Sequence, residues 1–487
     1  MAWGLSITND TNKKKILSVV SVTTMASFMT GLNARLAAVG FPVIVHELNC
    51  GIDEVIWIIQ GFMIGSTIIQ LIVGSLADIY GRVRLFNIGL LIFSLGGLGS
   101  GLAINAPLLT IFRVVQGIGA AFLMTLSITI LTDNIPKNML GTWFGINQIA
   151  WRAGAIIGLT FSGIIIDYLG WRWVYLINFP IGIVVYVWSL KSLKETYRPA
   201  GNRCLDWAGF ILFTLFMMFL ASSLTMMMNI KNWGYLVTIF FLLSAISLIL
   251  FIIHENKSKC RALDLSIFKI QQFSTGITAQ FLYAIGFGSF ITLLVIFIEV
   301  VRGYSASLTG FLLTPFELSF LIFGIVGGRL SDNFGFAPVA TTGLLMASFS
   351  LYMLSRLGMN VSLEHLMICV FLFGIGAGLF IAPNTSSIMT STPPEKRGVA
   401  SAIRTFSFNI GFLVSLNIAM LSLVGSTSYE IATKLIISEG RVENLSDVPL
   451  EKVYMGISNS FLMMAIIMMI ALLLSAYQLK TSASKQK

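Results

Sequence analysis

Apolar runs of about 20 residues recur from one end of this chain to the other. A run of that length crosses the hydrocarbon core of a bilayer as one helix, and in lipid only helices and closed barrels pair every backbone polar group. The runs show no strand-like alternation, and only 11% of the residues are charged, against about 25% in ordinary soluble domains. The pattern predicts an all-α membrane protein.

Counting the runs between polar, glycine or proline breaks predicts about fourteen transmembrane helices. The first run follows Lys13, Lys14 and Lys15, as in a signal peptide, but it lacks a convincing cleavage site and is expected to remain as the first membrane helix. The expected spans are residues 16–39, 55–77, 85–105, 107–132, 140–166, 172–190, 205–228, 233–254, 273–299, 305–328, 337–357, 363–389, 398–424 and 456–478.

Most of the 31 Lys and Arg residues fall in alternate connecting segments, on the side where both termini are expected. Basic residues stay on the cytoplasmic side, so a multi-pass protein of the cell (plasma) membrane with cytoplasmic termini is predicted. The net charge of +10 is then explained by basic residues in the cytoplasmic segments, and no nucleic-acid partner is expected. The four cysteines lack metal or disulfide spacing, and no phosphate loop or catalytic cluster is seen, so no cofactor, no metal and no enzyme activity are predicted.

Two stretches of the chain have a second copy. Residues 74–82 match residues 328–336 at an offset of 254, and residues 116–120 match residues 373–377 at an offset of 257. Repeated halves are typical of transporters made of two parallel six-helix bundles. We therefore expect one bundle at residues 1–190 and a second at 272–487, the latter with an outer loop at 425–455. Residues 191–271 are expected to form basic linkers and an inserted two-helix hairpin.

Three motifs resemble those of a known family. Residues 74–84 read Gly-Ser-Leu-Ala-Asp-Ile-Tyr-Gly-Arg-Val-Arg, residues 113–121 read Arg-Val-Val-Gln-Gly-Ile-Gly-Ala-Ala, and residues 170–182 begin the sixth span. With about fourteen spans, they resemble the major facilitator superfamily, specifically its fourteen-helix drug:proton antiporter branch. The resemblance implies a secondary active transporter that binds a small molecule between its halves and exposes it to each side in turn.

The charged turn is the first candidate site. Gly81 permits a backbone conformation that other residues resist, and Asp78 and Asp133 can accept hydrogen bonds from Arg82. The resemblance implies that this cluster latches the outward-facing state; the alternative is that the arginines only set topology and Asp78 caps a helix. The second copy lacks the arginines. The expected latch residues are Gly74, Asp78, Gly81, Arg82, Arg84 and Asp133.

Charged residues inside the spans are the second candidate site, because they are costly in a bilayer and usually face a cavity. The resemblance implies proton coupling for Arg113 and Gln116, and Glu317 is the acid best placed to bind a proton. The alternative for Arg113 and Glu317 is a structural hydrogen bond. The expected residues of the substrate cavity are Asn33, Arg35, Gln60, Asn147, Gln148, Arg152, Asn384 and Arg404.

Two departures from the family pattern bear on the substrate. The first span has Asn33 where an acid is usual, and the fifth span keeps glycines but no proline. Arg35, Arg113 and Arg152 all lie in the N-terminal half, so a cationic compound is expected to be repelled. We expect a monomer in the lipid bilayer that exports small amphipathic organic compounds, anionic or zwitterionic, in exchange for protons. An importer or uniporter, or a lipid flippase of the same fold, is the alternative.

Overall fold

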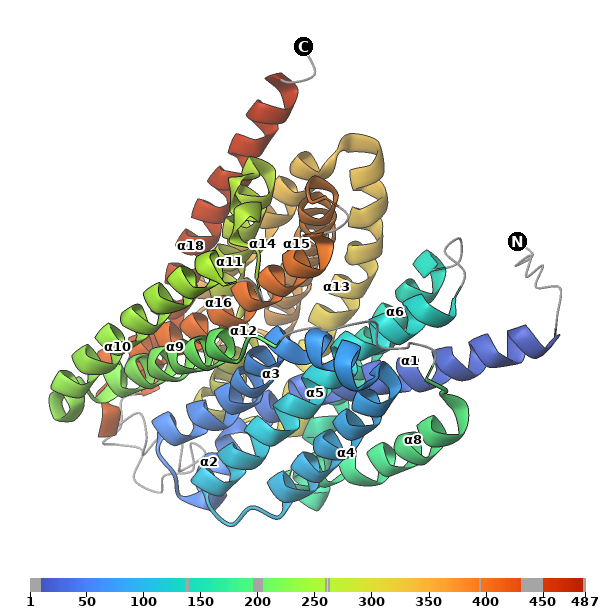
Figure 1. Cartoon of the computed structure of the whole chain (residues 1–487). Helices are drawn as coiled ribbons and strands as arrows, with labels where there is room; N and C mark the ends of the chain where they lie inside the picture. Colours follow the sequence, from blue (N-terminus) through green and yellow to red (C-terminus); the bar gives the residue numbers. More distant parts are fainter. Residues whose placement is uncertain are drawn as a thin grey trace.

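The computed structural model describes residues 10–135, 140–195, 205–258, 261, 263–393, 396–430 and 450–484, which are mostly helical (Figure 1). The helices are α1 (Asp10–Val39), α2 (Phe41–Leu48), α3 (Ile52–Tyr80), α4 (Arg82–Gly101), α5 (Ala106–Asn134), α6 (Leu140–Leu169), α7 (Trp171–Leu176), α8 (Asn178–Ser192), α9 (Trp207–Met226), η1 (Met227–Asn229), α10 (Ile230–Lys257), η2 (Leu265–Lys269), α11 (Gln271–Phe287), α12 (Phe290–Val295), η3 (Ile296–Val301), α13 (Ala306–Phe334), α14 (Phe336–Arg356), α15 (Leu363–Ser391), α16 (Arg397–Ser426) and α18 (Leu450–Ser484). The predicted outer loop at 425–455 falls largely outside the described residues.

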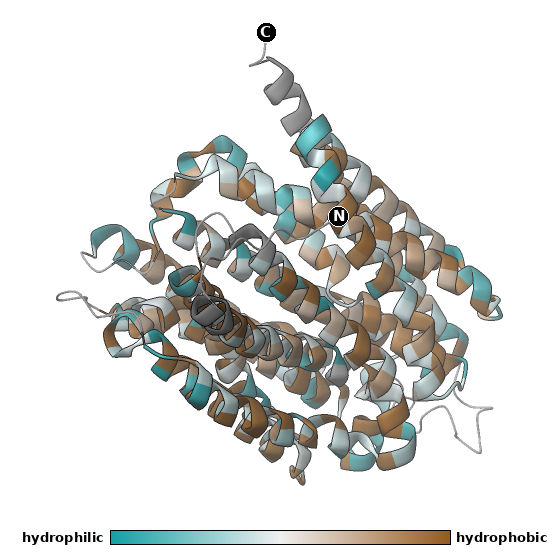
Figure 2. Ribbon diagram, turned by 90° about the vertical axis from the view of Figure 1, so that its right-hand side faces the viewer, coloured by the Kyte–Doolittle hydropathy of each residue, from teal (hydrophilic) through white to brown (hydrophobic). Residues whose placement is uncertain are grey.

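These helices provide 14 segments that are long and apolar enough to cross a membrane, within the described part of the chain. Some spans combine shorter helices: α7 and α8 form Trp171–Ser192, and α11, α12 and η3 form Gln271–Val301. Figure 2 shows hydrophobic residues along the helices and hydrophilic residues gathered toward their ends. The predicted number of membrane spans is confirmed.

The charged turn and its second copy have the same backbone geometry. Gly81, between α3 and α4, has φ +99°, and Gly335, between α13 and α14, has φ +85°. Side chains with a Cβ rarely adopt this region, so both turns require glycine. The repeat that was inferred from residue identities is thus also a repeat of conformation.

Helix packing follows the same repeat. A Cβ on Gly117 would lie 2.1 Å from the carbonyl oxygen of Phe62, and a Cβ on Gly374 would lie 2.4 Å from the carbonyl oxygen of Phe316. The glycines match at the offset of 257 and the phenylalanines at the offset of 254. Each half therefore places its fourth helix directly against the backbone of its second.

The halves, α1–α8 and α11–α18, meet along two seams. On one seam α6 packs on α13, where Thr160 and Thr314 hydroxyls lie 2.7 Å apart. On the other, α3 lies beside α16, and Asn409 donates to the hydroxyl of Thr67 over 2.6 Å. Both contacts join helices from different halves of the repeat.

The seams are closed at one end of the molecule. We name this the outer end, after the predicted topology; there Asp167 of α6 accepts from the backbone and hydroxyl of Ser307, and Asp53 of α3 accepts from the Tyr429 hydroxyl. Toward the opposite, inner end, where α6 begins and α13 ends, the two helices diverge (Figure 1). The halves are therefore in contact at the outer end, and α6 and α13 are farther apart at the inner end.

The two inserted helices cover the α3–α16 seam. The ring of Phe213 on α9 packs 5.0 Å from that of Phe406 on α16, and the same apolar cluster includes Ile64 and Leu71 of α3. α10 packs mainly on α9. Its remaining surface exposes large apolar side chains: Tyr235, Ile239, Phe241, Leu242, Ile246, Ile249 and Leu250.

A polar contact fixes the linker after the hairpin to the C-terminal half. Lys396, before α16, lies 2.7 Å from the carboxylate of Asp264. The hydrogen bonds from Lys396 and Ser266 lower the pKa of Asp264 to about 2. The linker carboxylate is therefore charged at neutral pH and fixed to the inner end of the bundle.

Candidate functional site

A buried acid is shared between the two halves. Glu317, in the middle of α13, is fully buried, and its Oε1 accepts a hydrogen bond from Nε of Arg35 on α1 over 2.7 Å. Nη1 of Arg152 on α6 lies 3.6 Å from the other carboxylate oxygen, Oε2. We call Arg35, Arg152 and Glu317 the inter-half charge cluster. It unites two residues predicted for the substrate cavity with the predicted proton-binding acid.

Aromatic rings surround this cluster. The guanidinium of Arg35 lies 5.6 Å from the ring centre of Phe287 and 5.9 Å from that of Phe316. The guanidinium of Arg152 lies 3.7 Å from the ring of Phe320 and 4.9 Å from that of Trp151. Such contacts stabilise a cation that has left water, each by about 0.5–2 kcal/mol. The site thus combines charged groups with aromatic rings, of which Phe287, Phe316 and Phe320 are buried.

The cluster is electrostatically unbalanced, with two cations facing one anion. Removing one partner of a buried ion pair leaves an uncompensated charge, which costs about 3–5 kcal/mol. Arg152 is the most accessible member, with 19% of its side chain exposed, against 10% for Arg35 and none for Glu317. A negatively charged ligand group would meet Arg152 first.

Arg113 and Gln116 lie in a different place from Glu317. Nη1 of Arg113 donates to Gln116 over 2.7 Å and to Asn33 over 3.3 Å, and the guanidinium lies over the rings of Phe62 and Tyr175. All of these contacts are internal to the N-terminal half. The three residues grouped for proton coupling are therefore divided, and Asn33 belongs with Arg113 and not with Arg35.

The predicted latch residues come together in part. Arg82 donates to Asp133 over 2.5 Å and to Asp78 over 3.1 Å, so it joins the inner ends of α3 and α5. The side chain of Arg84 is exposed. A Cβ on Gly74 would meet no atom within 4 Å, so packing does not require glycine there.

One residue that contacts the charged turn was not predicted from the sequence. The carboxylate of Glu195, after α8, accepts hydrogen bonds from the backbone N–H groups of Arg82, Val83 and Arg84 over 3.2, 2.9 and 3.3 Å. It caps the positive end of α4, where an acid is favoured. Glu195 stands in a stretch read only as a basic linker, and its distance in sequence from the turn hid the contact.

The remaining predicted cavity residues lie apart from the cluster. Asn147 accepts from Ser27 inside the N-terminal half, and Asn384 donates to the carbonyl of Gly276 inside the C-terminal half. Gln60 is buried, with no hydrogen-bond partner for its amide among the described residues. Gln148 is exposed on α6 and Arg404 is partly buried on α16. Of the eight predicted residues, Arg35 and Arg152 contact Glu317.

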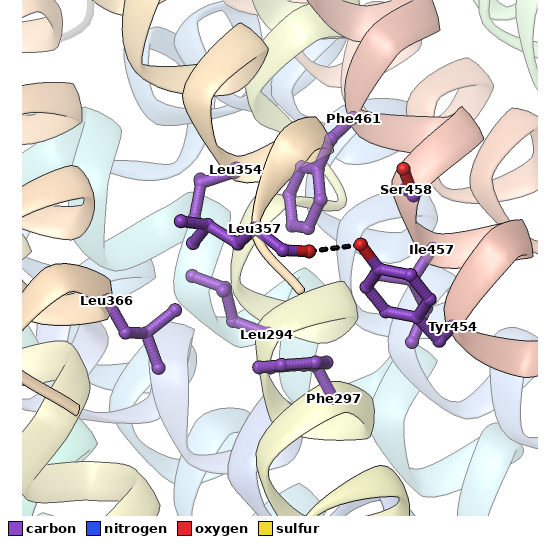
Figure 3. A pocket seen from close by; sticks show the side chains of 9 residues that line it. All are labelled: Leu294, Phe297, Leu354, Leu357, Leu366, Tyr454, Ile457, Ser458 and Phe461. Carbon is purple, nitrogen blue, oxygen red and sulfur yellow. Dashed lines mark hydrogen bonds between the residues drawn. The ribbon is translucent and has the colours of Figure 1, made fainter. Parts of the chain in front are cut away.

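An apolar pocket lies within the C-terminal half, among η3, α14, α15 and α18 (Figure 3). Phe297, Leu354 and Phe461 line it, and the Tyr454 hydroxyl donates to the carbonyl of Leu357 at its edge. Its volume is about 10 Å³, which is close to the room that one water needs. The pocket is too small for an organic substrate.

Two six-helix bundles with buried charges at their interface are an arrangement typical of membrane transporters. The family model of the Major Facilitator Superfamily matches residues 23–255 and 276–487. The chain therefore belongs to the major facilitator superfamily, whose members are transporters and not enzymes. The predicted family and fold class are confirmed.

Individual relatives and structures agree with this assignment. The chain is 29% identical to the multidrug transporter protein MdtP of Bacillus subtilis over 80% of this chain and 71% of that protein. It is 27% identical to the riboflavin transporter RibZ of Clostridioides difficile over 81% of this chain and 86% of that protein. Among solved structures, a bacterial homologue of the human lysosomal transporter Spinster, in an inward-facing and unoccupied conformation, matches with a TM-score of 0.70 at 18% identity, over 96% and 98% of the chains.

Proposed function

We propose that this protein exports small amphipathic organic compounds across the cell membrane in exchange for protons. The observation that carries the proposal is the inter-half charge cluster, in which Glu317 of one half is held by Arg35 and Arg152 of the other. The transporter would act as a monomer with both termini in the cytoplasm. Protons and the substrate are its two ligands.

Protonation of Glu317 gives a physical route from proton binding to movement. A protonated carboxyl no longer attracts the two guanidinium groups, so the ionic contacts that hold the halves together across α1, α6 and α13 weaken. Deprotonation restores them. A proton can therefore shift the balance between the conformation closed outside and one closed inside, as alternating access requires.

The aromatic and cationic surroundings of Glu317 support the substrate class. The rings of Phe287, Phe316 and Phe320 lie beside the arginines, and the surplus guanidinium charge favours a ligand with a negative group. Relatives named as multidrug and riboflavin transporters are consistent with compounds that contain aromatic rings. A purely cationic compound would be repelled by Arg35 and Arg152.

The Asp78–Arg82–Asp133 group is proposed as the conformational latch at the inner end. It holds the inner ends of α3 and α5 as one unit while the halves are apart. Glu195 would support it by capping α4. The second copy, in which Asp332 is exposed and Phe336 stands at the position of Arg82, would take no part.

Flux in proteoliposomes tests the proposed function. The purified protein is reconstituted, a pH gradient is imposed, and uptake or release of matched cationic, neutral, anionic and zwitterionic aromatic compounds is followed. We expect the gradient to drive at least one compound with a negative group, anionic or zwitterionic, against its concentration and opposite to the proton. Flux that ignores the pH gradient would exclude proton coupling, and flux in the direction of the proton would favour the alternative of an importer.

A further inference from the structure

The carboxylate of Glu317 has one satisfied and one unsatisfied oxygen. Oε1 accepts from Arg35, whereas Oε2 is buried and accepts no hydrogen bond from any described residue. The 3.6 Å separation between Oε2 and Nη1 of Arg152 suits an ion pair but is too long for a hydrogen bond. A buried carboxylate oxygen without a donor is costly, so Oε2 is a place for a proton or for an N–H donor of a ligand.

The charged groups around Glu317 set what else the ligand must contain. The titratable side chains that interact with Glu317 from neighbouring helices are Arg35 of α1, Arg152 of α6 and Tyr283 of α11. Two of these three side chains are cations, and none of the three is a carboxylate. A ligand carboxylate that pairs with Arg152 would offset the surplus charge.

Whether the ligand and the proton strengthen each other's binding or compete then depends on the charge of the ligand. If a pure anion binds at the arginines, protonation of Glu317 removes the one negative charge nearby and strengthens anion binding. By linkage the anion also strengthens proton binding, and the two would travel together. Exchange requires the opposite relation, in which the ligand and the proton compete for one place.

We infer that the substrate is a zwitterion whose carboxylate pairs with Arg152 and Arg35 and whose ammonium group takes the Oε2 position of Glu317 in place of the proton. This inference rests on the proposed exchange with protons. A pure cation would compete with the proton but would be repelled by both guanidinium groups. A pure anion would be attracted but would not compete. A zwitterion meets both requirements, and the rings of Phe316 and Phe320, buried in this conformation, lie beside the two arginines with which its carboxylate would pair.

Binding measured in detergent tests this inference without transport. Three fluorescent compounds share one aromatic body: Nε-dansyl-lysine is a zwitterion, its methyl ester is a cation, and its Nα-acetyl derivative is an anion. We expect the zwitterion to bind about tenfold or more tightly than either relative, as one added charge-assisted hydrogen bond provides. In weakly buffered solution, a pH indicator should report proton release when the zwitterion binds and proton uptake when the anion binds.

Variants separate the roles of the charged groups. Glu317→Gln should abolish proton release and leave binding of the anionic compound intact, because the amide resembles the protonated acid. Arg152→Gln should remove the preference for the zwitterion over the ester. Arg172→Gln, which changes an arginine paired with Glu47 at the outer end, is the matched control and should leave both readouts unchanged.

Three outcomes would overturn the inference: tighter binding of the ester than of the zwitterion, proton uptake when the zwitterion binds, or no binding by any of the three compounds. Failure of the proposed function is distinguishable from these. If the zwitterion binds with proton release but flux in proteoliposomes ignores the pH gradient, the inferred ligand chemistry stands and the proton-driven export is wrong.

Discussion

Arg35 and Glu317 are 282 residues apart in the chain and 2.7 Å apart in space, and they belong to different halves of the repeat. A movement of one half against the other would change this separation. The bonds of Arg82 to Asp78 and Asp133 lie inside one half and can persist through the same movement. We therefore propose that the two groups serve different steps: the first would respond to the relative position of the halves, and the second would keep one half rigid.

Replacement of Glu317 by glutamine is expected to uncouple transport from protons. The amide cannot change charge, so substrate flux driven by a pH gradient should fall at least about tenfold, which corresponds to the loss of about 1.4 kcal/mol of coupling. Exchange of labelled for unlabelled substrate without a gradient should persist. The measurement is flux in proteoliposomes with and without the gradient.

Glu364→Gln is the control for this prediction. Glu364 lies exposed in the first turn of α15, far along the chain from the cluster, and its replacement should leave both fluxes unchanged. If Glu317→Gln responded to the gradient as the unmodified protein does, another group would have to bind the coupling proton.

The two copies of the charged turn are expected to differ in importance. Asp78→Asn removes the charge that pairs with Arg82, whereas Asp332→Asn changes an exposed residue of the second copy. Transport should fall severalfold or more in the first variant and stay near normal in the second. Comparable losses in flux assays of the two variants, at equal amounts of protein in the membrane, would contradict the latch.

The fold was predictable from sequence because its signals are local or repeated. A membrane helix is recognisable from about 20 successive residues. The two turns at Gly81 and Gly335 share glycine because a positive φ requires it, so the repeat was visible before the structure. Both features can be recognised from short segments of the sequence.

The partners of the site were only partly predictable, because they depend on how distant helices are placed. Sequence identified Arg35, Arg152 and Glu317 as buried charges but did not pair them. It grouped Glu317 with Arg113, which instead bonds to Gln116 and Asn33. Pairing of side chains across two rigid bundles is set by a relative orientation that no single segment specifies.

Close packing at Gly163 is expected to hold the outer end shut. A Cβ at this position of α6 would lie 2.1 Å from the carbonyl oxygen of Ala306 on α13, so Gly163→Val must push these two helices apart. Overpacking of this kind costs about 1–3 kcal/mol. We expect the variant to favour conformations in which the outer end is open, and labelling of Ser307→Cys by an impermeant maleimide added outside should rise severalfold.

Gly145→Val, on the same helix, is the matched control. A Cβ on Gly145 would meet no atom within 4 Å, so the same substitution adds the same bulk without a clash. It should leave the labelling of Ser307→Cys unchanged. Equal labelling in the Gly163→Val and Gly145→Val backgrounds would show that the contact with Ala306 does not control the outer end.

Glu195 is expected to stabilise the charged turn through the N-terminus of α4. Its carboxylate accepts from three successive N–H groups, beginning at Arg82, so Glu195→Ala should cost about 1 kcal/mol, the usual worth of a helix cap. Lys194→Ala, at the exposed neighbouring position, controls for the loss of a charged side chain from the same linker. Thermal unfolding should show a lower midpoint for Glu195→Ala than for Lys194→Ala. The difference should shrink in high salt, because the interaction of an exposed carboxylate with a helix end is screened. Equal midpoints at low salt would mean that the cap contributes nothing to the stability of the turn.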